Sequence, residues 1–285
     1  MKFNKYFKNI IIFGASGYVG SNIRSYFGDD NITFVSRTNK GDLNIDINKY
    51  DQFENLLIDS QTLLILLSAI SSPDFCRQNF KEAYFTNVIS TSRLIDFTLK
   101  RNGKVLFFSS DVVYGKKNIE FKEESVCNPI GEYAEMKRNV ELKYLNNKNF
   151  KIIRPSYIFS LEDKFSKYLI SSARSGEKVN IYHPLYRNII FIDDLLEGTM
   201  KLIQNWNKID FNIINFGGGK LLSRKDIANY YKKYFFNTLN IDITEPPLDF
   251  FDARPKVVNI NSEKLEIILG RKTYDLEKLF INKKI

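Results

Sequence analysis

The chain has 285 residues, of which 44% are hydrophobic and 26% charged, so it can bury a substantial core as one large domain or two smaller ones. The longest apolar run, residues 63–69, is far shorter than the roughly 20 residues that cross a bilayer, and no secretory segment follows the N-terminal lysines. We expect a cytoplasmic protein with no membrane partner. Two cysteines and the single His183 argue against a disulfide framework, most zinc sites and Ser-His hydrolase triads, so we expect no metal centre.

The formal net charge is +9, from 42 lysines and arginines against 33 aspartates and glutamates. A basic balance suits nucleic-acid binding, and it equally suits an enzyme whose cofactor and substrate both carry phosphates. The lysines are dispersed among acidic residues, without a dense basic block, so most of them are expected to be solvated surface residues. We therefore expect no nucleic-acid partner.

The first informative stretch is residues 9–20, NIIIFGASGYVG. Its apolar run, residues 10–13, predicts a strand buried on both faces, and Gly14, Gly17 and Gly20 predict a tight turn that leads into a helix over residues 18–27. Unpaired N–H groups and the positive end of a helix dipole suit a pyrophosphate. The pattern indicates a dinucleotide site, although an ordinary strand-to-helix loop would also fit it.

A short strand over residues 31–36 completes a β-α-β unit. In such units an acidic residue after the second strand usually binds the ribose hydroxyls of NAD, whereas a nearby arginine accommodates the extra phosphate of NADP. This strand ends in Ser36 and Arg37, with no carboxylate. We predict NADP, with both residues at the 2′-phosphate. NAD is possible, and Arg37 would then be an exposed loop residue.

Strands and helices continue to alternate along the chain. Residues 63–69 predict a third buried strand, residues 73 to about 100 a long helical stretch, and residues 104–109 a fourth strand. Repeated βαβα order with continuous apolar strands predicts a parallel sheet covered by helices on both faces.

Two later segments carry candidate catalytic groups. SSDVVYG, residues 109–115, places Ser110 at the carboxyl end of the fourth strand, where open α/β sheets bind ligands. Tyr133 and Lys137 are four apart on a predicted helix, so they share a face. An ammonium beside a phenol is expected to lower the phenol pKa, and such a trio can move a proton to or from a sugar hydroxyl. Alone, the tyrosine and lysine would be a solvated helix face, and the serine a cap.

Together, GASGYVG, SSDVVYG and YAEMK resemble the extended short-chain dehydrogenase/reductase family, which contains nucleotide-sugar epimerases, dehydratases and reductases. YFTNVISTSRLID, RPSYIF, RNIIFIDDLLEG, NFGGG and ARPKVVNINSEKLEIILG extend the resemblance over nearly the whole chain. It implies a Rossmann-type doubly wound parallel sheet in residues 1–158, to which 188–218 return, and a smaller mixed α/β substrate-binding lobe in 159–285. A homodimer through the helices that carry Asn87 and Tyr133 is a family expectation.

The resemblance also implies roles for individual residues. Ser110 would hold the substrate oxygen, Tyr133 would be the acid/base, and Lys137 would bind the nicotinamide ribose. The substrate, a nucleotide-diphosphate sugar, would contact Ser110, Asp111, Tyr157, Arg187 and Arg254. The expected cofactor contacts are Gly14, Ser16, Gly17, Tyr18, Val19, Gly20, Ser36, Arg37, Asp46, Ile47, Leu67, Ser68, Ala69, Asn87, Tyr133 and Lys137.

Departures from the family patterns bear on the reaction. Ser110 is followed by Asp111 and Val112 rather than by the Asp-Glu of 4,6-dehydratases, which disfavours dehydration. The missing acid at Ser36 counts against NAD-dependent C4-epimerases. RPSYIF, with Tyr157 where asparagine is usual, is closer to 4-keto-6-deoxysugar reductases, whereas RNIIFIDD is more epimerase-like.

We therefore predict an NADPH-dependent reductase of a nucleotide-linked 4-keto-(6-deoxy)hexose in surface-polysaccharide sugar biosynthesis. Hydride would pass to C4 while Tyr133 donates the proton. Two alternatives remain: a nucleotide-sugar epimerase with tightly bound NAD(P), and a non-catalytic dinucleotide- or RNA-binding protein. Retention of Ser110, Tyr133 and Lys137 together argues against the last.

Overall fold

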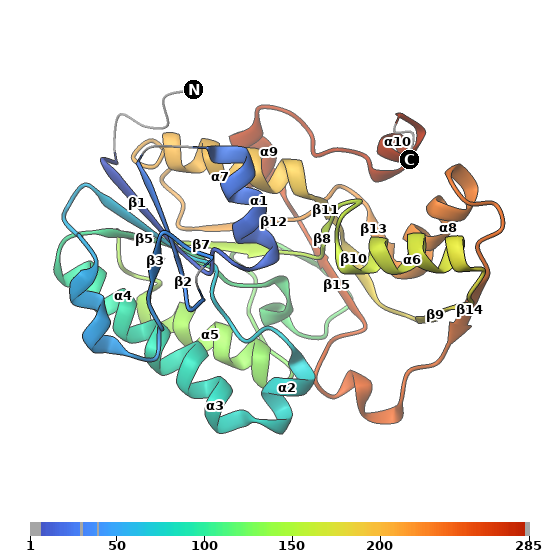
Figure 1. Ribbon diagram of the computed structural model, residues 1–285, viewed down its shortest axis with the longest axis horizontal. Helices are drawn as coiled ribbons and strands as arrows, with labels where there is room; N and C mark the ends of the chain where they lie inside the picture. The colour runs from blue at the N-terminus through green and yellow to red at the C-terminus, as the bar shows by residue number, and fades with distance from the viewer. Residues whose placement is uncertain (1–6, 29–30, 39, 283–285) are drawn as a thin grey trace.

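A parallel sheet of seven strands forms the centre of the molecule (Figure 1). The computed structural model describes residues 7–28, 31–38 and 40–282. Every neighbouring pair in the sheet is parallel, which confirms the predicted Rossmann-type doubly wound architecture. In spatial order the strands are β12 (Ile213–Phe216), β7 (Phe150–Pro155), β5 (Lys104–Phe108), β4 (Thr62–Leu66), β1 (Asn9–Phe13), β2 (Ile32–Ser36) and β3 (Leu43–Asn44).

Both faces of this sheet are buried, as the continuous apolar strands predict. Ile10 and Ile12 of β1 join one core cluster with the apolar faces of α1 (Tyr18–Phe27) and α7 (Ile192–Gln204). Ile11 and Phe13 point the other way, into a cluster with α4 (Thr91–Lys100) and α5 (Glu132–Tyr144). Figure 1 shows the two helix layers on opposite sides of the sheet. The ligand-accessible part is consequently the edge of strand ends.

The stretch from Pro73 to Lys100 differs from the single helix that the sequence predicts. It is divided into α2 (Pro73–Gln78), α3 (Phe80–Tyr84), a π-helical turn η2 (Phe85–Ser90) and α4. Asn79 leaves helical geometry between α2 and α3, with φ −122° and ψ 49°. The π turn changes the side-chain phase of the helix at the residues around Asn87. The third strand is also shorter than predicted, because β4 ends at Leu66 and the chain turns there.

A smaller mixed lobe lies beyond the carboxyl edge of the main sheet (Figure 1). Its four-stranded sheet has the order β13-β10-β15-β6, in which β10 pairs antiparallel with β13 and parallel with β15. The strands outside the main sheet are β6 (Glu120–Phe121), β8 (Ile158–Phe159), β9 (Val179–Tyr182), β10 (Tyr186–Asn188), β11 (Ile190–Phe191), β13 (Leu221–Ser223), β14 (Ile241–Thr244) and β15 (Val257–Ile260). The remaining helices are η1 (Tyr50–Asn55), η3 (Asp111–Tyr114), α6 (Lys164–Ser175), α8 (Arg224–Tyr234), η4 (Leu248–Phe251), α9 (Glu263–Leu269) and α10 (Leu276–Asn282). Of the helices in the described ranges, none has the length and apolar character needed to cross a membrane.

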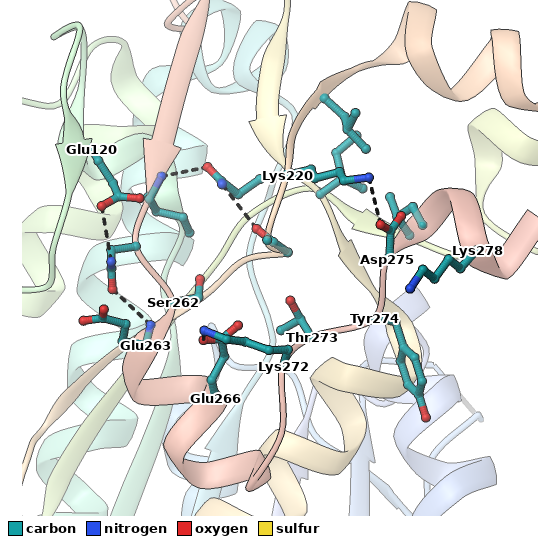
Figure 2. A pocket seen from close by; sticks show the side chains of 18 residues that line it. Glu120, Lys220, Ser262, Glu263, Glu266, Lys272, Thr273, Tyr274, Asp275 and Lys278 are labelled. Carbon is teal, nitrogen blue, oxygen red and sulfur yellow. Dashed lines mark hydrogen bonds and ion pairs between the residues drawn. The ribbon is translucent and has the colours of Figure 1, made fainter.

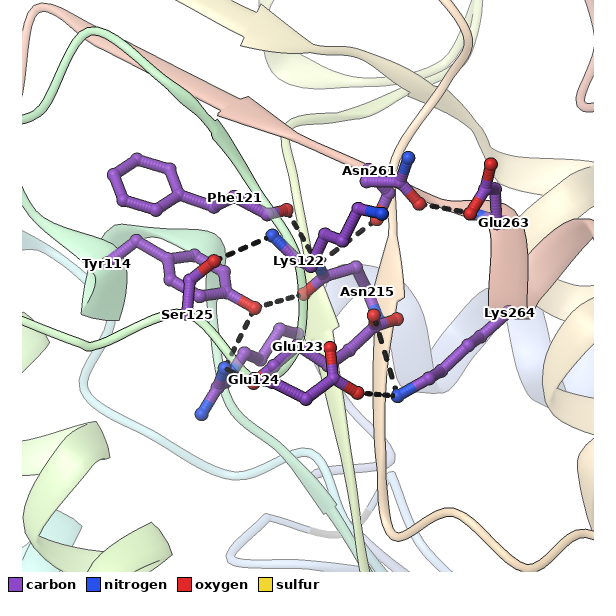
Figure 3. A network of polar contacts seen from close by, with 11 residues as sticks. Tyr114, Phe121, Lys122, Glu123, Glu124, Ser125, Asn215, Asn261, Glu263 and Lys264 are labelled. Carbon is purple, nitrogen blue, oxygen red and sulfur yellow. Dashed lines mark hydrogen bonds and ion pairs between the residues drawn. The ribbon is translucent and has the colours of Figure 1, made fainter.

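A buried ion pair anchors α5 to the main sheet. Glu141 of α5 accepts from Arg154 of β7 through both oxygens, with Nε–Oε1 at 2.9 Å and Nη2–Oε2 at 2.7 Å, and both side chains are at most 1% exposed. Arg154 Nη1 also donates to Tyr114 Oη at 2.8 Å. Tyr114 in turn donates to Asn215 of β12 at 2.8 Å, and the Asn215 N–H donates to Glu123 at 2.9 Å (Figure 3). The network fixes the helix that carries Tyr133 and Lys137.

We predict that Glu141→Gln lowers the free energy of unfolding by about 3–5 kcal/mol, because it leaves the Arg154 guanidinium buried without its counter-charge. Urea denaturation measures this loss. Glu54→Gln is the matched control, since Glu54 pairs with Arg101 at 3.0 Å on the exposed surface and its loss should cost below about 1 kcal/mol. Equal losses in the two variants would contradict the anchoring role.

Candidate active site

A groove of about 270 Å³ follows the carboxyl ends of β1, β2 and β4. It is bounded by the glycine turn after β1, the residues after β2, the segment around Asp46 and the loop after β4. The structure therefore brings together these predicted cofactor contacts: Gly14, Ser16, Gly17, Ser36, Arg37, Asp46, Ile47, Leu67, Ser68 and Ala69. The sequence did not identify Asn48 and Thr86, which also line the groove and are joined by a 3.1 Å hydrogen bond.

The turn at the head of this groove requires glycine. Gly14 has φ +95°, and a Cβ there would lie 2.9 Å from the Ser68 nitrogen. A Cβ on Gly20 would lie 2.4 Å from the Gly14 carbonyl oxygen, so α1 packs directly on the turn. Gly17 occupies the N-cap of α1 and offers no side chain to the first N–H groups. This cradle, at the positive end of a ten-residue helix, fits the pyrophosphate of a dinucleotide.

The end of β2 has the composition that the sequence indicates. Ser36 is buried, and its hydroxyl donates to the Thr38 carbonyl. Arg37 is exposed and lines the groove. Among the described residues of the lining, Asp46 is the one carboxylate, and its Oδ1 accepts from the Asn48 N–H at 3.0 Å. Arg37 and Asp46 are thus the charged side chains of the described lining, one of each sign.

Several predicted cofactor contacts lie behind the groove and not in its lining. Asn87 accepts from the Ile70 N–H at 2.8 Å and donates to the Ile70 carbonyl at 2.9 Å, so it clamps the loop after β4. Tyr18 donates to Ser160 Oγ at 2.6 Å, toward the smaller lobe. Val19 packs against the core cluster under α1. In this structure Asn87 shapes the groove indirectly, through the loop that forms its wall.

Ser110 and Lys137 lie where β5 ends, and Tyr133 lies one turn before Lys137 on α5; neither Tyr133 nor Lys137 is in the lining of the groove. Ser110 caps η3 by accepting from the Val112 N–H at 3.4 Å. Lys137 is buried, and its Nζ donates to the Phe108 carbonyl at 2.7 Å, at the last residue of β5. The same Nζ lies 6.0 Å from the centroid of the Tyr133 ring. A single hydrogen bond therefore ties the lysine of α5 to the strand that leads into Ser110.

The titration of this pair differs from the sequence expectation. Burial raises the pKa of Tyr133, as do Cys76 and Asp111 nearby, so the predicted lowering by Lys137 is wrong for this structure. Burial also lowers the pKa of Lys137 to about 8, although the Glu141 carboxylate opposes the shift. The reason is that desolvation by burial is the largest cause of the pKa shift in both groups. Tyr133 thus keeps its proton at neutral pH, which suits a proton donor.

A second cavity, of about 480 Å³, lies between the main sheet and the smaller lobe. Its lining contains all of the predicted substrate residues, Ser110, Asp111, Tyr157, Arg187 and Arg254. No sequence motif indicates the other side chains in its lining, because the packing of the smaller lobe determines where they lie. They include Asp74, Tyr182, Leu185, Leu222, Arg224 and Phe250.

Charged pairs form part of this substrate cavity. Asp111 is 3% exposed, accepts from Ser156 Oγ at 2.7 Å and lies 3.7 Å from Arg187 Nε. Desolvation raises the pKa of Asp111 and lowers the pKa of Arg187. Arg254 pairs with Asp74 at 2.8 Å, at the start of α2. Both predicted arginines therefore line the cavity while already bound to protein carboxylates.

A third cavity, of about 610 Å³, contains none of the predicted site residues (Figure 2). It shares Ile189 and Leu222 with the substrate cavity. Its charges are largely paired locally: Lys220 with Asp275 at 2.8 Å, and Lys272 with Glu266 at 2.7 Å. Across the described ranges of the chain, no group of three or more His, Cys, Asp or Glu side chains could hold a metal ion.

Comparison with known proteins identifies relatives of this chain. A family model described as the RmlD substrate binding domain matches residues 8–250. The chain is 25% identical over 286 residues to UDP-glucuronic acid decarboxylase 5 of Arabidopsis thaliana, covering 90% of this chain and 82% of that protein. It is 24% identical over 228 residues to dTDP-4-dehydrorhamnose reductase of Aggregatibacter actinomycetemcomitans, covering 77% and 76%. The solved structure of MoeE5 in complex with UDP-glucose and NAD has a TM-score of 0.77 at 18% identity over 96% of each chain, so it shares the fold. These matches confirm the family resemblance that the motifs predict.

We predict a stability signature for the buried Lys137. Its pKa is about 8 in the folded protein against an ordinary 10.5, so between these values the unfolded chain holds a proton that the folded chain has released. The free energy of unfolding should therefore rise with pH across this window. Lys137→Met removes the contribution, and its stability should rise less steeply than that of the wild type from pH 8 to 10.5.

Urea denaturation at a series of pH values measures both slopes. Lys49→Met, a substitution of an exposed lysine, is the control and should follow the wild type. Parallel curves for wild type and Lys137→Met would show that burial in the folded protein does not lower the pKa of Lys137.

Proposed function

Because the chain belongs to the RmlD substrate-binding-domain family, we propose that it is an NADPH-dependent reductase of a nucleotide-linked 4-keto-(6-deoxy)hexose. The sugar would serve surface-polysaccharide synthesis. The proposal has three parts: the class of substrate, the cofactor, and the direction of the reaction. Each is supported by a different part of the site.

The observation that carries the proposal is the position of Ser110 between two cavities. It lines the substrate cavity directly after β5, and β5 pairs with β4, whose following loop lines the dinucleotide groove. Ile70 belongs to the groove and Pro73, three residues later, to the substrate cavity. The two cavities therefore lie along the same edge of the sheet, which supports a transfer between a dinucleotide and a second ligand.

The chemistry follows from the side chains at this junction. NADPH, when bound, supplies the hydride that reduces a carbonyl carbon. Tyr133 holds its proton at neutral pH and gives it to the developing alkoxide oxygen. Ser110 donates a hydrogen bond to the same oxygen and stabilises its negative charge. Lys137, tied to β5, would hold the nicotinamide ribose, and a proton from solvent returns Tyr133 to the phenol after each turnover. The ketone becomes an alcohol, and NADPH becomes NADP⁺.

The direction is supported by the state of Tyr133. An epimerase begins by removing a proton from a hydroxyl, which requires the phenolate, whereas a reductase begins with the neutral phenol. The raised pKa of Tyr133 favours the second case. The similarity to a dTDP-4-dehydrorhamnose reductase over 77% of this chain points the same way.

A second candidate keeps the same site with internal redox chemistry: a nucleotide-sugar epimerase or decarboxylase with tightly bound NAD(P). It is favoured by one observation, the similarity to UDP-glucuronic acid decarboxylases over 90% of the chain. Such an enzyme would oxidise and re-reduce the sugar within one turnover, so it would consume no cofactor. The two candidates therefore differ in stoichiometry.

The test is to mix the protein with NADPH and a nucleotide-linked 4-keto-6-deoxyhexose and to follow the absorbance of NADPH. We predict one NADPH oxidised for each sugar reduced, because hydride leaves the cofactor permanently. Tyr133→Phe should keep the fold and NADPH binding while losing about 10²-fold or more of turnover, since it cannot donate the proton. Unchanged turnover in Tyr133→Phe would remove that residue from the mechanism, and product without NADPH loss would favour the second candidate.

Cofactor preference rests on Arg37. We predict that Arg37→Ala weakens NADPH binding roughly 10- to 100-fold and leaves NADH binding nearly unchanged, because only NADPH has a 2′-phosphate for the guanidinium. Titration of both cofactors against both proteins measures the ratio. Arg93→Ala, on α4 away from the groove, is the control for loss of one arginine. Equal weakening of NADPH and NADH would contradict the assignment.

A further inference from the structure

The substrate cavity contains three arginines, and two of them are engaged by the protein. Arg187 Nη1 donates to the Tyr186 carbonyl at 2.7 Å, and Nη2 donates to the Pro255 carbonyl at 2.9 Å. Its Nε faces Asp111 at 3.7 Å. A guanidinium held from three sides in this way ties β10 to the segment before β15. It has little of its fork left for a bidentate contact with a phosphate.

Arg254 is engaged in a similar way. Its Nη1 donates to the Phe250 carbonyl at 3.1 Å, and its Nη2 pairs with Asp74 Oδ2 at 2.8 Å. The Arg254 Cζ also lies 4.1 Å from the centroid of the Phe250 ring, within the roughly 6 Å of a cation–π contact. Its side chain is 13% exposed. Arg254 thus holds η4 and α2 together across the cavity.

Arg224 is different. Within the described part of the chain it donates no hydrogen bond and forms no ion pair, although it is exposed and lines the cavity. Its guanidinium lies 5.6 Å from the Tyr157 ring and 5.2 Å from the Phe165 ring. Asp163, at the N-cap of α6, accepts from the Phe165 and Ser166 N–H groups and forms no ion pair with Arg224. The full fork of Arg224 is available to a ligand.

The backbone fixes Arg224 in this place. Leu222 of β13 lies opposite Arg187 of β10, and Ser223 then caps α8 in a capping box with Asp226. Arg224 is therefore the first residue of α8, at the positive end of the helix dipole, where a cation is disfavoured. The charge does not stabilise the helix. Its partner is expected outside the protein.

The electrostatics of the cavity agree with this. Arg224 and Arg254 both act on Arg187 and, after burial, lower its pKa, so the three cations are close enough to repel one another. Asp111 and Asp74 offset Arg187 and Arg254, which leaves the charge of Arg224 uncompensated. A dianionic group in the cavity would relieve this repulsion.

We propose that Arg224 is a substrate-binding residue whose guanidinium binds the diphosphate of the nucleotide-linked sugar, while Arg187 and Arg254 mainly position the cavity walls. This rests on the proposed function, which supplies the class of substrate. It assigns the principal phosphate contact to a residue outside the motifs of the chain. Arg187 becomes a positioning residue that holds Asp111 and β10.

The experiment is calorimetric titration of UDP, dTDP and the corresponding nucleosides into wild type, Arg224→Ala, Arg224→Lys and Lys232→Ala. We expect Arg224→Ala to weaken diphosphate binding roughly 10- to 100-fold, with Arg224→Lys intermediate, because a charge-assisted fork is lost. Nucleoside and NADPH affinities should stay unchanged. Lys232→Ala removes an exposed charge from the same helix and should leave diphosphate binding as in the wild type.

Unchanged diphosphate affinity in Arg224→Ala, or an equal loss in Lys232→Ala, would overturn the proposal. An Arg224→Ala protein that keeps its affinity for UDP and loses affinity only for a nucleotide-linked hexuronic acid would also overturn the proposal, since Arg224 would then bind a sugar carboxylate. The proposed function is tested independently of Arg224: it fails if the protein binds the diphosphate but does not consume NADPH. A wild-type protein that binds neither UDP nor dTDP would overturn both the proposed function and the role of Arg224.

Discussion

The burial of both faces of the parallel sheet is the constraint on which the site depends. Helices cover β1, β4 and β5 from either side. Accordingly, Ile10 lies in one core cluster and the next residue, Ile11, lies in the other. The backbone at the carboxyl edge is then the part of the sheet that ligands can approach. The glycine turn, the loop clamped by Asn87 and the cap at Ser110 all lie on this edge. Cofactor groove and substrate cavity are consequences of the same packing.

Buried charge gives this edge its chemistry. Lys137 donates to the Phe108 carbonyl, and Glu141, one turn further along α5, is held by Arg154 of β7. These contacts keep α5 in register with the strands, and the same burial raises the pKa of Tyr133 and lowers that of Lys137. The burial of α5 against the sheet therefore accounts both for the fixed position of the helix and for the shifted pKa values of Tyr133 and Lys137. A phenol that keeps its proton is suited to protonating an alkoxide, as the proposed reduction requires.

The sequence predicts most of the framework because its signals are local. Continuous apolar runs predict the buried strands, and Gly14 with φ +95° occupies the turn that the glycine spacing indicates. All five substrate residues implied by the family resemblance line one cavity. The long-range contacts are less accessible to such reasoning. The fork of Arg187 is bound by Pro255, 68 residues away, and the packing of the smaller lobe brings Arg224 into the same cavity. The break of the helix at Asn79 and the pKa of Tyr133 likewise depend on tertiary packing.

In the proposed reaction, hydride passes permanently from NADPH to the sugar at the strand edge that carries Ser110. The most direct measurement uses NADPH carrying deuterium at the transferred position of the nicotinamide, with the isolated sugar product examined by mass spectrometry and NMR. The account predicts one deuterium in each product molecule, at C4, with a matching amount of NADP⁺. An unlabelled product formed while the labelled cofactor stays intact would contradict it, since the hydride would then have come from the sugar itself.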